Sequence, residues 1–310
     1  MRALARLCLV LLLALVPAAQ ATADDAIQGR ILFIKDGDLW LMDSSGPHPL
    51  ATGGTFSQPA WAPDGGSLAY VYRGTNFADI FVTDDQGQNQ TRLTNSQSTV
   101  LDNNDWNLRP AFSPDGQYIA FVSDRSSALP TLWLINADGS GRRTLATPGL
   151  QEEDVDALSW SPDGTQLAFT MFNEPGPTQI GVVPLPPAGR QQAHIVTTQA
   201  GGALDPAWSP DGDWLAFAGH DGPALEIYAL QPGNSESLPT RLTSDGQLAR
   251  SASWSPDGQH IAYLSNKTGN FEIFVLDIST DASGTLVASR PRQLTKDLHV
   301  DAASGLSWGR

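Results

Sequence analysis

The chain has 310 residues, with 33 acidic against 18 basic side chains and a formal net charge of −15. A surplus of negative charge repels phosphate backbones and anionic membrane surfaces, so nucleic acid is not an expected partner. The single cysteine, Cys8, lies near the N-terminus. The rest of the chain therefore cannot form a disulfide or a cysteine metal site.

The first residues have the pattern of a secretory signal. Two arginines precede an apolar run over residues 7–16, and small residues follow a proline. The run is shorter than the roughly 20 apolar residues that a membrane helix needs, so no membrane span is expected. We interpret residues 1–21 as a cleavable signal peptide and residues 22–30 as a short linker. The pattern predicts a periplasmic or secreted protein, held together by its core alone.

A five-residue tag, made of an aromatic residue followed by Ser or Ala and then Pro-Asp-Gly, recurs along the rest of the chain. The tag occupies residues Trp61–Gly65, Phe112–Gly116, Trp160–Gly164, Trp208–Gly212 and Trp254–Gly258. Proline sets φ for a tight turn, and glycine allows a positive φ where the turn closes. Each tag therefore predicts a strand that ends at the aromatic residue and a turn that starts the next strand.

Each unit continues with the same strand signals. Leu or Ile, then Ala, then an aromatic residue predict a buried second strand, as in residues 68–70. A third apolar strand follows, and Arg-Leu-Thr predicts a short outer strand, as in residues 92–94. After Trp160, the third strand runs into prolines, so residues 184–193 are expected to form an irregular outer loop. Four short strands per 46 to 54 residues are typical of a β-propeller blade.

The two ends of the chain complement each other. Residues 31–52 match the second, third and fourth strands of a blade, and residues 305–308 match a first strand with nothing after it. Joined together, they make one blade and bring the number to six. The sequence therefore predicts an all-β, six-bladed propeller over residues 31–310, closed by pairing of the C-terminal strand with the N-terminal strands. Such a ring has no open edge.

The tags, the buried second strands and the Arg-Leu-Thr strands resemble the TolB-like propeller repeat, over essentially all of residues 31–310. The resemblance implies a propeller fold that occurs in several functional settings. TolB itself is a periplasmic scaffold with an additional N-terminal α/β domain, and prolyl-oligopeptidase-type enzymes add a C-terminal hydrolase domain. About ten residues precede the first strand after the predicted cleavage site, and the chain stops within the closing strand. We therefore expect a stand-alone exported propeller of the binding-module type.

Catalytic motifs are not evident in the sequence. It contains no H-E-x-x-H motif and no glycine-rich phosphate loop before a helix. The five histidines fall in different repeat units without ligand spacing. These observations favour a binding protein over an enzyme.

Strand order decides which loops share a face of the ring. The tag turns lie on one face, which we call the turn face. The loops from second to third strands and the connections between blades lie on the other, which we call the loop face. Binding residues are concentrated on loops that a rigid frame holds in place. The acidic and aromatic residues of the loop face, with one arginine, are the predicted binding residues: Phe77, Asp102, Asp105, Trp106, Arg109, Glu152, Asp154, Asp156 and Asp205.

Two functional hypotheses follow from this surface. The first is a monomeric, non-enzymatic exported scaffold that binds an envelope or extracellular protein or peptide and needs no cofactor. Aromatic residues such as Trp106 and Phe77 would anchor the partner, or would pack locally under their loops. The alternative is a Ca²⁺-dependent hydrolase, lactonase-like or phosphoesterase-like, because carboxylates at this density are the ligands that Ca²⁺ prefers. Arg109 and Arg250 lie near strand starts, where they are expected to pair with acidic residues.

Overall fold

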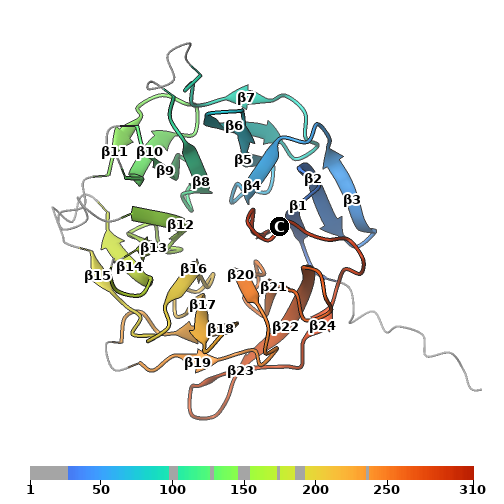
Figure 1. Ribbon diagram of the computed structural model, residues 1–310, viewed down its shortest axis with the longest axis vertical. Helices are drawn as coiled ribbons and strands as arrows, with labels where there is room; N and C mark the ends of the chain where they lie inside the picture. The colour runs from blue at the N-terminus through green and yellow to red at the C-terminus, as the bar shows by residue number, and fades with distance from the viewer. Residues whose placement is uncertain are drawn as a thin grey trace, which may run out of the picture.

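The computed structural model describes residues 27–97, 104–125, 129–145, 154–172, 175–185, 193–234 and 237–310. Six antiparallel β-sheets stand around a common axis in these residues (Figure 1). The all-β, six-bladed propeller predicted from the repeats is confirmed. None of the described residues forms a helix that is long and apolar enough to cross a membrane.

The strands follow the chain blade by blade, from the axis outward. Blade 1 contains β4 (Phe56–Trp61), β5 (Ser67–Arg73), β6 (Ala78–Asp84) and β7 (Thr91–Arg92). Blade 2 contains β8 (Asn107–Phe112), β9 (Tyr118–Ser123), β10 (Thr131–Asn136) and β11 (Arg143–Thr144). Blade 3 contains β12 (Asp154–Trp160), β13 (Gln166–Phe172), β14 (Gln179–Pro184) and β15 (His194–Ile195). Blade 4 contains β16 (Ala203–Trp208), β17 (Leu215–Asp221), β18 (Ala224–Leu230) and β19 (Thr240–Arg241).

The last two blades depart from this plain order. Blade 5 contains β20 (Ala249–Trp254), β21 (His260–Ser265), β22 (Glu272–Thr280), β23 (Leu286–Ala288) and β24 (Arg292–Gln293). Its long β22 pairs with both β23 and β24. Blade 6 contains β25 (Ser307–Gly309), β1 (Arg30–Lys35), β2 (Asp38–Asp43) and β3 (Gly46–Ala51), in that order from the axis.

The shared blade closes the ring as predicted. β25 pairs with β1, and Trp308 lies opposite Ile31 in the register. The Trp308 side chain is buried, and its indole Nε1 donates a hydrogen bond of 2.8 Å to the Gln28 carbonyl. Residues 280 positions apart therefore hold each other in one sheet, next to the axis (Figure 1).

The tag turns have the geometry that their residues favour. In blade 2, the Gly116 amide donates to the Ser113 carbonyl at 2.8 Å, and Gly116 has a φ of 70°. The Ser113 hydroxyl donates to Asp115 at 2.6 Å, and the carboxylate also accepts the Gln117 amide. A residue with a Cβ atom is strained at such a φ, which is why glycine ends each tag.

The outer strands are short, and a buried carboxylate secures them. In blade 4, Glu226 has no exposed surface and accepts hydrogen bonds from the Thr243 hydroxyl and the Gly246 amide. Arg241 forms an ion pair with the same carboxylate at 2.9 Å. The same arrangement joins Asp79 to Thr94 in blade 1 and Glu272 to Thr295 in blade 5. The Arg-Leu-Thr sequence therefore marks a short fourth strand and also supplies the hydrogen bonds that attach it to the buried carboxylate of the third strand.

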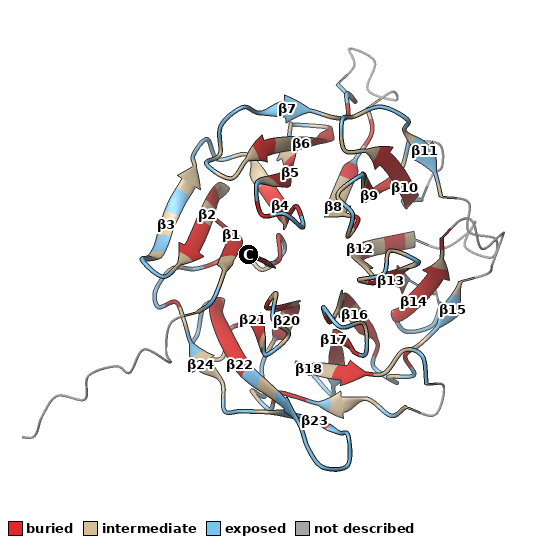
Figure 2. Ribbon diagram, turned by 180° about the vertical axis from the view of Figure 1, so that it is seen from behind, coloured by how far each residue is buried: buried red, intermediate tan, exposed pale blue. Residues whose placement is uncertain are grey.

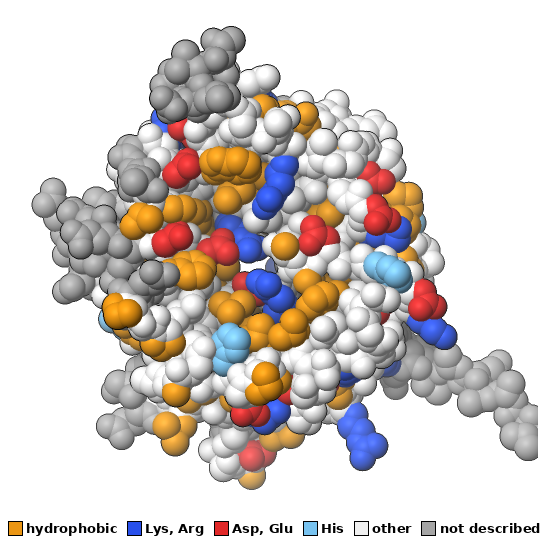
Figure 3. All heavy atoms as spheres, in the orientation of Figure 1, with side chains coloured by type: hydrophobic (Ala, Val, Ile, Leu, Met, Phe, Trp, Pro, Cys, Tyr) orange, Lys and Arg blue, Asp and Glu red, His pale blue; other side chains and the backbone are white. Residues whose placement is uncertain are grey.

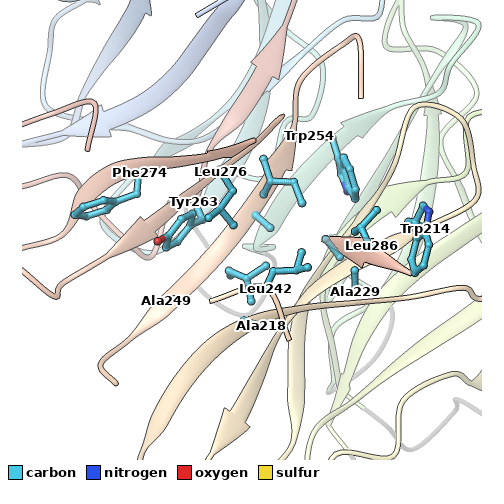
Figure 4. Packing of buried hydrophobic residues seen from close by; sticks show 14 of the residues in the cluster. Trp214, Ala218, Ala229, Leu242, Ala249, Trp254, Tyr263, Phe274, Leu276 and Leu286 are labelled. Atoms are coloured by element: carbon cyan, nitrogen blue, oxygen red, sulfur yellow. The ribbon is translucent and has the colours of Figure 1, made fainter. Parts of the chain in front are cut away.

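The core lies along the inner strands and between neighbouring blades. The aromatic residues of the second strands are at most 1 % exposed: Tyr70, Phe121, Phe169, Phe217 and Tyr263. Burial falls toward the outer strands β3, β7, β11 and β15 (Figure 2). Side chains from blades 4 and 5 interdigitate in one such cluster (Figure 4). Close packing of this kind makes the ring a stiff frame for the residues at its axis.

Some predicted segments lie outside the described residues. These are the signal peptide, the first part of the linker, and most of the predicted irregular loop over residues 184–193. In blade 3, β14 ends at Pro184, as predicted from the prolines, and β15 follows the undescribed residues 186–192.

Candidate binding site at the ring axis

The innermost strand of each of blades 1 to 5 contains a β-bulge at the same place. The register shifts three or four residues before the end of the strand. The residue three positions before each tag aromatic has a positive φ: Gln58, Arg109, Ala157, Asp205 and Ser251, with Gly305 at the matching place in blade 6. Positive φ is uncommon for residues other than glycine. Bulges redirect a side chain and often occur beside functional sites.

All six bulge positions line one cavity of about 330 Å³ at the axis. The ring of positions was not anticipated from the sequence, although its signal is simple, since each member stands third before a tag aromatic. The cavity is polar where Arg109 and Asp205 enter it, and the tag aromatics Trp61, Phe112 and Trp160 are also part of its lining. This central cavity, with the charged residues at its loop-face end, is the candidate site.

Arg109 links blade 2 to blade 3 across this cavity. Its Nε and Nη2 atoms lie 2.7 and 2.9 Å from the two carboxylate oxygens of Asp156. Its Nη1 atom donates to the Ala303 carbonyl, and its backbone amide donates to the Gln58 side chain. Burial alone would lower the pKa of Arg109, but Asp156, together with the charges of Asp205 and Asp301, outweighs burial and raises that pKa. The guanidinium therefore stays charged and is held by blade 3 and by the connection to blade 6.

A second pair links blade 4 to blade 5. Arg250 Nε and Nη2 lie 3.0 and 3.2 Å from the Asp205 carboxylate oxygens. The Ser251 amide and hydroxyl donate to the same carboxylate, and the Asp205 amide donates to Thr170. The expectation that Arg109 and Arg250 pair with acidic residues is confirmed. Such two-point pairs fix orientation as well as charge.

Carboxylates outnumber guanidinium groups around the cavity mouth. Asp154 begins β12, and both burial and the neighbouring Asp156 carboxylate raise its pKa. Asp301 accepts the Ala303 amide and the Ser304 hydroxyl, and its charge also acts on Arg109. In the space-filling view, charged side chains of both signs surround a hollow at the ring centre, with hydrophobic side chains around them (Figure 3). The mouth is therefore acidic and can accept positively charged or hydrogen-bonding groups.

The predicted aromatic and acidic residues of blades 1 and 2 have different environments. Trp106 directly precedes β8, and 37 % of its surface is exposed. Asp105 is buried and pairs with Arg125 at 2.9 Å. Phe77 is also buried, against the Tyr72 ring and the Arg92 guanidinium. For Phe77 the geometry supports local packing, which was one of the two interpretations of its sequence position.

The structure brings Arg109, Asp156 and Asp205 to the axis, with Asp154 at the rim of the same mouth. The predicted residues Asp102 and Glu152 lie outside the described residues. Among the residues that are described, no group of three or more His, Cys, Asp or Glu side chains is placed to hold a metal ion.

Comparison with known proteins agrees with this architecture. The family described as the TolB beta propeller domain (PD40) matches residues 152–290. An uncharacterized protein of Agrobacterium fabrum is 31 % identical over 119 residues, which are 37 % of this chain and 37 % of that protein. The chain therefore shares only a minor part of the length of this relative.

Two solved structures have the same fold over nearly the whole chain. TolB from Acinetobacter baumannii superposes with a TM-score of 0.69 and 18 % identity, over 91 % of this chain and 66 % of that one. A putative TolB from Agrobacterium tumefaciens gives a TM-score of 0.67 and 15 % identity, over 90 % and 95 %. At these identities, the superpositions establish the fold alone. The chain therefore has the six-bladed β-propeller fold that these structures share, and its residues 152–290 match the TolB beta propeller family.

Proposed function

We propose that this propeller is an exported, non-enzymatic scaffold that binds a protein or peptide at the loop-face mouth of its central cavity. The observation that carries the proposal is the mouth itself. Arg109, Asp156, Asp205 and Arg250 are held by paired hydrogen bonds from neighbouring blades. Their positions are set before a partner arrives, which lowers the entropy cost of binding.

The chemistry of the mouth indicates what it would bind. Asp154, Asp156, Asp205 and Asp301 surround two guanidinium groups, so the local charge is negative. A partner segment with lysine or arginine would complement this charge. Export, which we infer from the predicted signal peptide, would place that partner in the envelope or outside the cell.

Trp106 supplies the apolar part of the surface. It stands three residues before Arg109 on the same edge of blade 2, and it is among the most exposed large hydrophobic residues described. Exposed tryptophans next to charged groups are frequent anchors in protein interfaces.

The test begins with the mature protein as bait on envelope extract and identification of the captured protein. The captured protein is then purified, and its affinity is measured by calorimetry. We expect Trp106→Ala to weaken binding by about tenfold or more, as for an anchoring residue. Val287→Ala, which truncates an exposed residue of blade 5, is the matched control and should leave the affinity unchanged.

Equal affinity of the Trp106→Ala variant and the unaltered protein would remove this surface from the interface. Strong retention of binding at high salt would contradict the acidic mouth as the attractive element, because exposed charges are screened by salt.

A further inference from the structure

A repeated contact joins neighbouring blades on the turn face. In blades 3 to 6, the residue that directly precedes the Leu or Ile of the second strand lies near the tag aromatic of the following blade. Between blades 6 and 1, the Arg30 guanidinium stands 4.4 Å from the centre of the Trp61 ring. Between blades 5 and 6, the His260 ring stacks on Trp308, with centroids 6.1 Å apart. A flat group covers the aromatic residue in both places.

Between blades 4 and 5, two side chains cover the tag aromatic Trp254. Trp214 occupies the repeated position and belongs to the same buried cluster as Trp254. Leu286, from the β22–β23 hairpin, joins that cluster and is 4 % exposed. The close view shows Leu286 beside the two tryptophans (Figure 4). An aliphatic side chain on an extended segment therefore packs beside a tag tryptophan at this position.

Between blades 3 and 4, the same space is open. The repeated position is Gln166, and a cavity of about 450 Å³ lies against Gln166, Trp208 and Pro232. The Trp208 Nε1 atom is buried without a hydrogen-bond partner among the residues described. The corresponding atoms of Trp160 and Trp254 donate to backbone carbonyls of the preceding blades.

The opening continues outward along the rim. A second cavity of about 700 Å³ shares His194 and Pro232 with the first. Ile195 and Leu238 line it and are 50 % and 84 % exposed. We call the two cavities together the blade 3–4 groove. It begins on the turn face, away from the loop-face mouth described above.

The groove has an acidic border. Asp163, Asp211 and Asp213 line the inner cavity, and none of the described residues that line either cavity is a lysine or an arginine. The Ser161 hydroxyl donates to Asp163 and holds its pKa below the ordinary value, so this carboxylate is ionised at neutral pH. An occupant with basic residues on both sides of its apolar side chain would match this border.

We propose that the blade 3–4 groove is a second binding site, which takes an aliphatic side chain from an extended, Lys- or Arg-flanked segment of a partner protein. The aliphatic side chain would lie beside Trp208 as Leu286 lies beside Trp254. The proposal stands on the contacts of blades 3 to 5 and does not depend on the loop-face site.

The test uses the ¹⁵N-labelled mature protein and three acetylated, amidated peptides. Their sequences are Lys-Thr-Leu-Thr-Lys, Lys-Thr-Asn-Thr-Lys and Glu-Thr-Leu-Thr-Glu. The Trp208 indole signal, assigned with Trp208→Phe, is followed during titration. We expect the first peptide to move this signal at up to millimolar concentration. The peptides without leucine or without lysine should bind about tenfold more weakly or worse.

Matched variants locate the site. Gln166→Trp recreates the residue of the next blade and should abolish the shift, whereas Ser67→Trp, at the equivalent position of blade 1, should not. Asp213→Asn changes an exposed carboxylate, leaves the core intact and should weaken the lysine peptide alone. Trp106→Ala, on the loop face, should have no effect on the titration.

The proposal is overturned if the leucine–lysine peptide leaves the Trp208 indole signal in place, or if the shift survives Gln166→Trp. It is also overturned if the glutamate peptide binds as well as the lysine peptide. Melting temperatures of the variants show whether a lost shift reflects a filled groove or an unfolded protein.

Discussion

Arg109 and Asp156 form a two-point ion pair between neighbouring blades, with nitrogen–oxygen distances of 2.7 and 2.9 Å. The Arg109 side chain is 16 % exposed and that of Asp156 is 31 % exposed, so solvent only partly screens the pair. The pair ties blades 2 and 3 together at the candidate site, and the same guanidinium also donates to the Ala303 carbonyl in the connection to blade 6.

Removal of one partner should cost more than removal of both. We expect Asp156→Ala to lower the free energy of unfolding by about 1–3 kcal/mol, because it leaves the Arg109 charge partly buried and unpaired. The double variant Arg109→Met/Asp156→Leu should recover much of this loss. Urea denaturation of the unaltered protein, the single variants Arg109→Met and Asp156→Leu, and the double variant measures the coupling. Additive losses in the double variant would show that the pair contributes nothing as a pair.

Asp154 should destabilise the protein at neutral pH. Its pKa is raised above 3.8 by burial and by Asp156, so the folded state keeps the proton longer than the unfolded state does. The stabilising contribution of the protonated form is lost as pH rises from the unfolded-state pKa of Asp154 to its higher folded-state pKa. Asp154→Asn should therefore raise the melting temperature at pH 7 and change it little at about pH 3.5. The reverse pattern would contradict the assigned direction.

The tag carboxylates should act in the opposite direction. The Ser113 and Ser161 hydroxyls lower the pKa values of Asp115 and Asp163 below 3.8. Their contribution is present above the unfolded-state pKa and is lost as pH falls through the lower folded-state values. Ser161→Ala should cost about 1 kcal/mol at neutral pH and shift acid unfolding to higher pH. Thr165→Val removes a different donor to Asp163 and should have a smaller effect.

Closure of the ring should depend on its last strand. Deletion of residues 305–310 removes β25 and the buried Trp308 side chain. The loss should exceed the roughly 3–5 kcal/mol of a buried Trp→Ala change. Thermal denaturation measures it, and small-angle scattering should show a larger radius of gyration. Trp308→Phe keeps most of the packing and should retain the closed ring. An unchanged radius after deletion would mean that the other five blades hold the ring closed.

Calcium distinguishes the scaffold from the alternative hydrolase. A ligand that binds only the folded state raises the melting temperature by mass action. For the scaffold, we expect no change at millimolar Ca²⁺ and no effect of EDTA. A rise that EDTA reverses would favour a metal-dependent enzyme, and substitution of Asp102 or Glu152 would then show which acidic cluster is responsible.

Local chemistry made much of the fold predictable. A turn such as Trp160–Gly164 depends on neighbouring residues only, and its repetition sets the number of blades. Closure could also be predicted, because Trp308 supplies the strand that residues 31–52 lack. Arg109 and Arg250 could be expected to pair, since unpaired buried charges are costly.

The strands, the six blades and the acidic residues of the loop face can be predicted from the amino-acid sequence, because turn chemistry and alternation act over a few residues. Folding of the whole ring is needed to bring Arg109 and Asp205 into one cavity and to bury Phe77 while Trp106 stays exposed. It also left Trp208 without the cover that Trp254 receives from Leu286. These outcomes depend on the angle between neighbouring blades, which is set by packing of the whole ring.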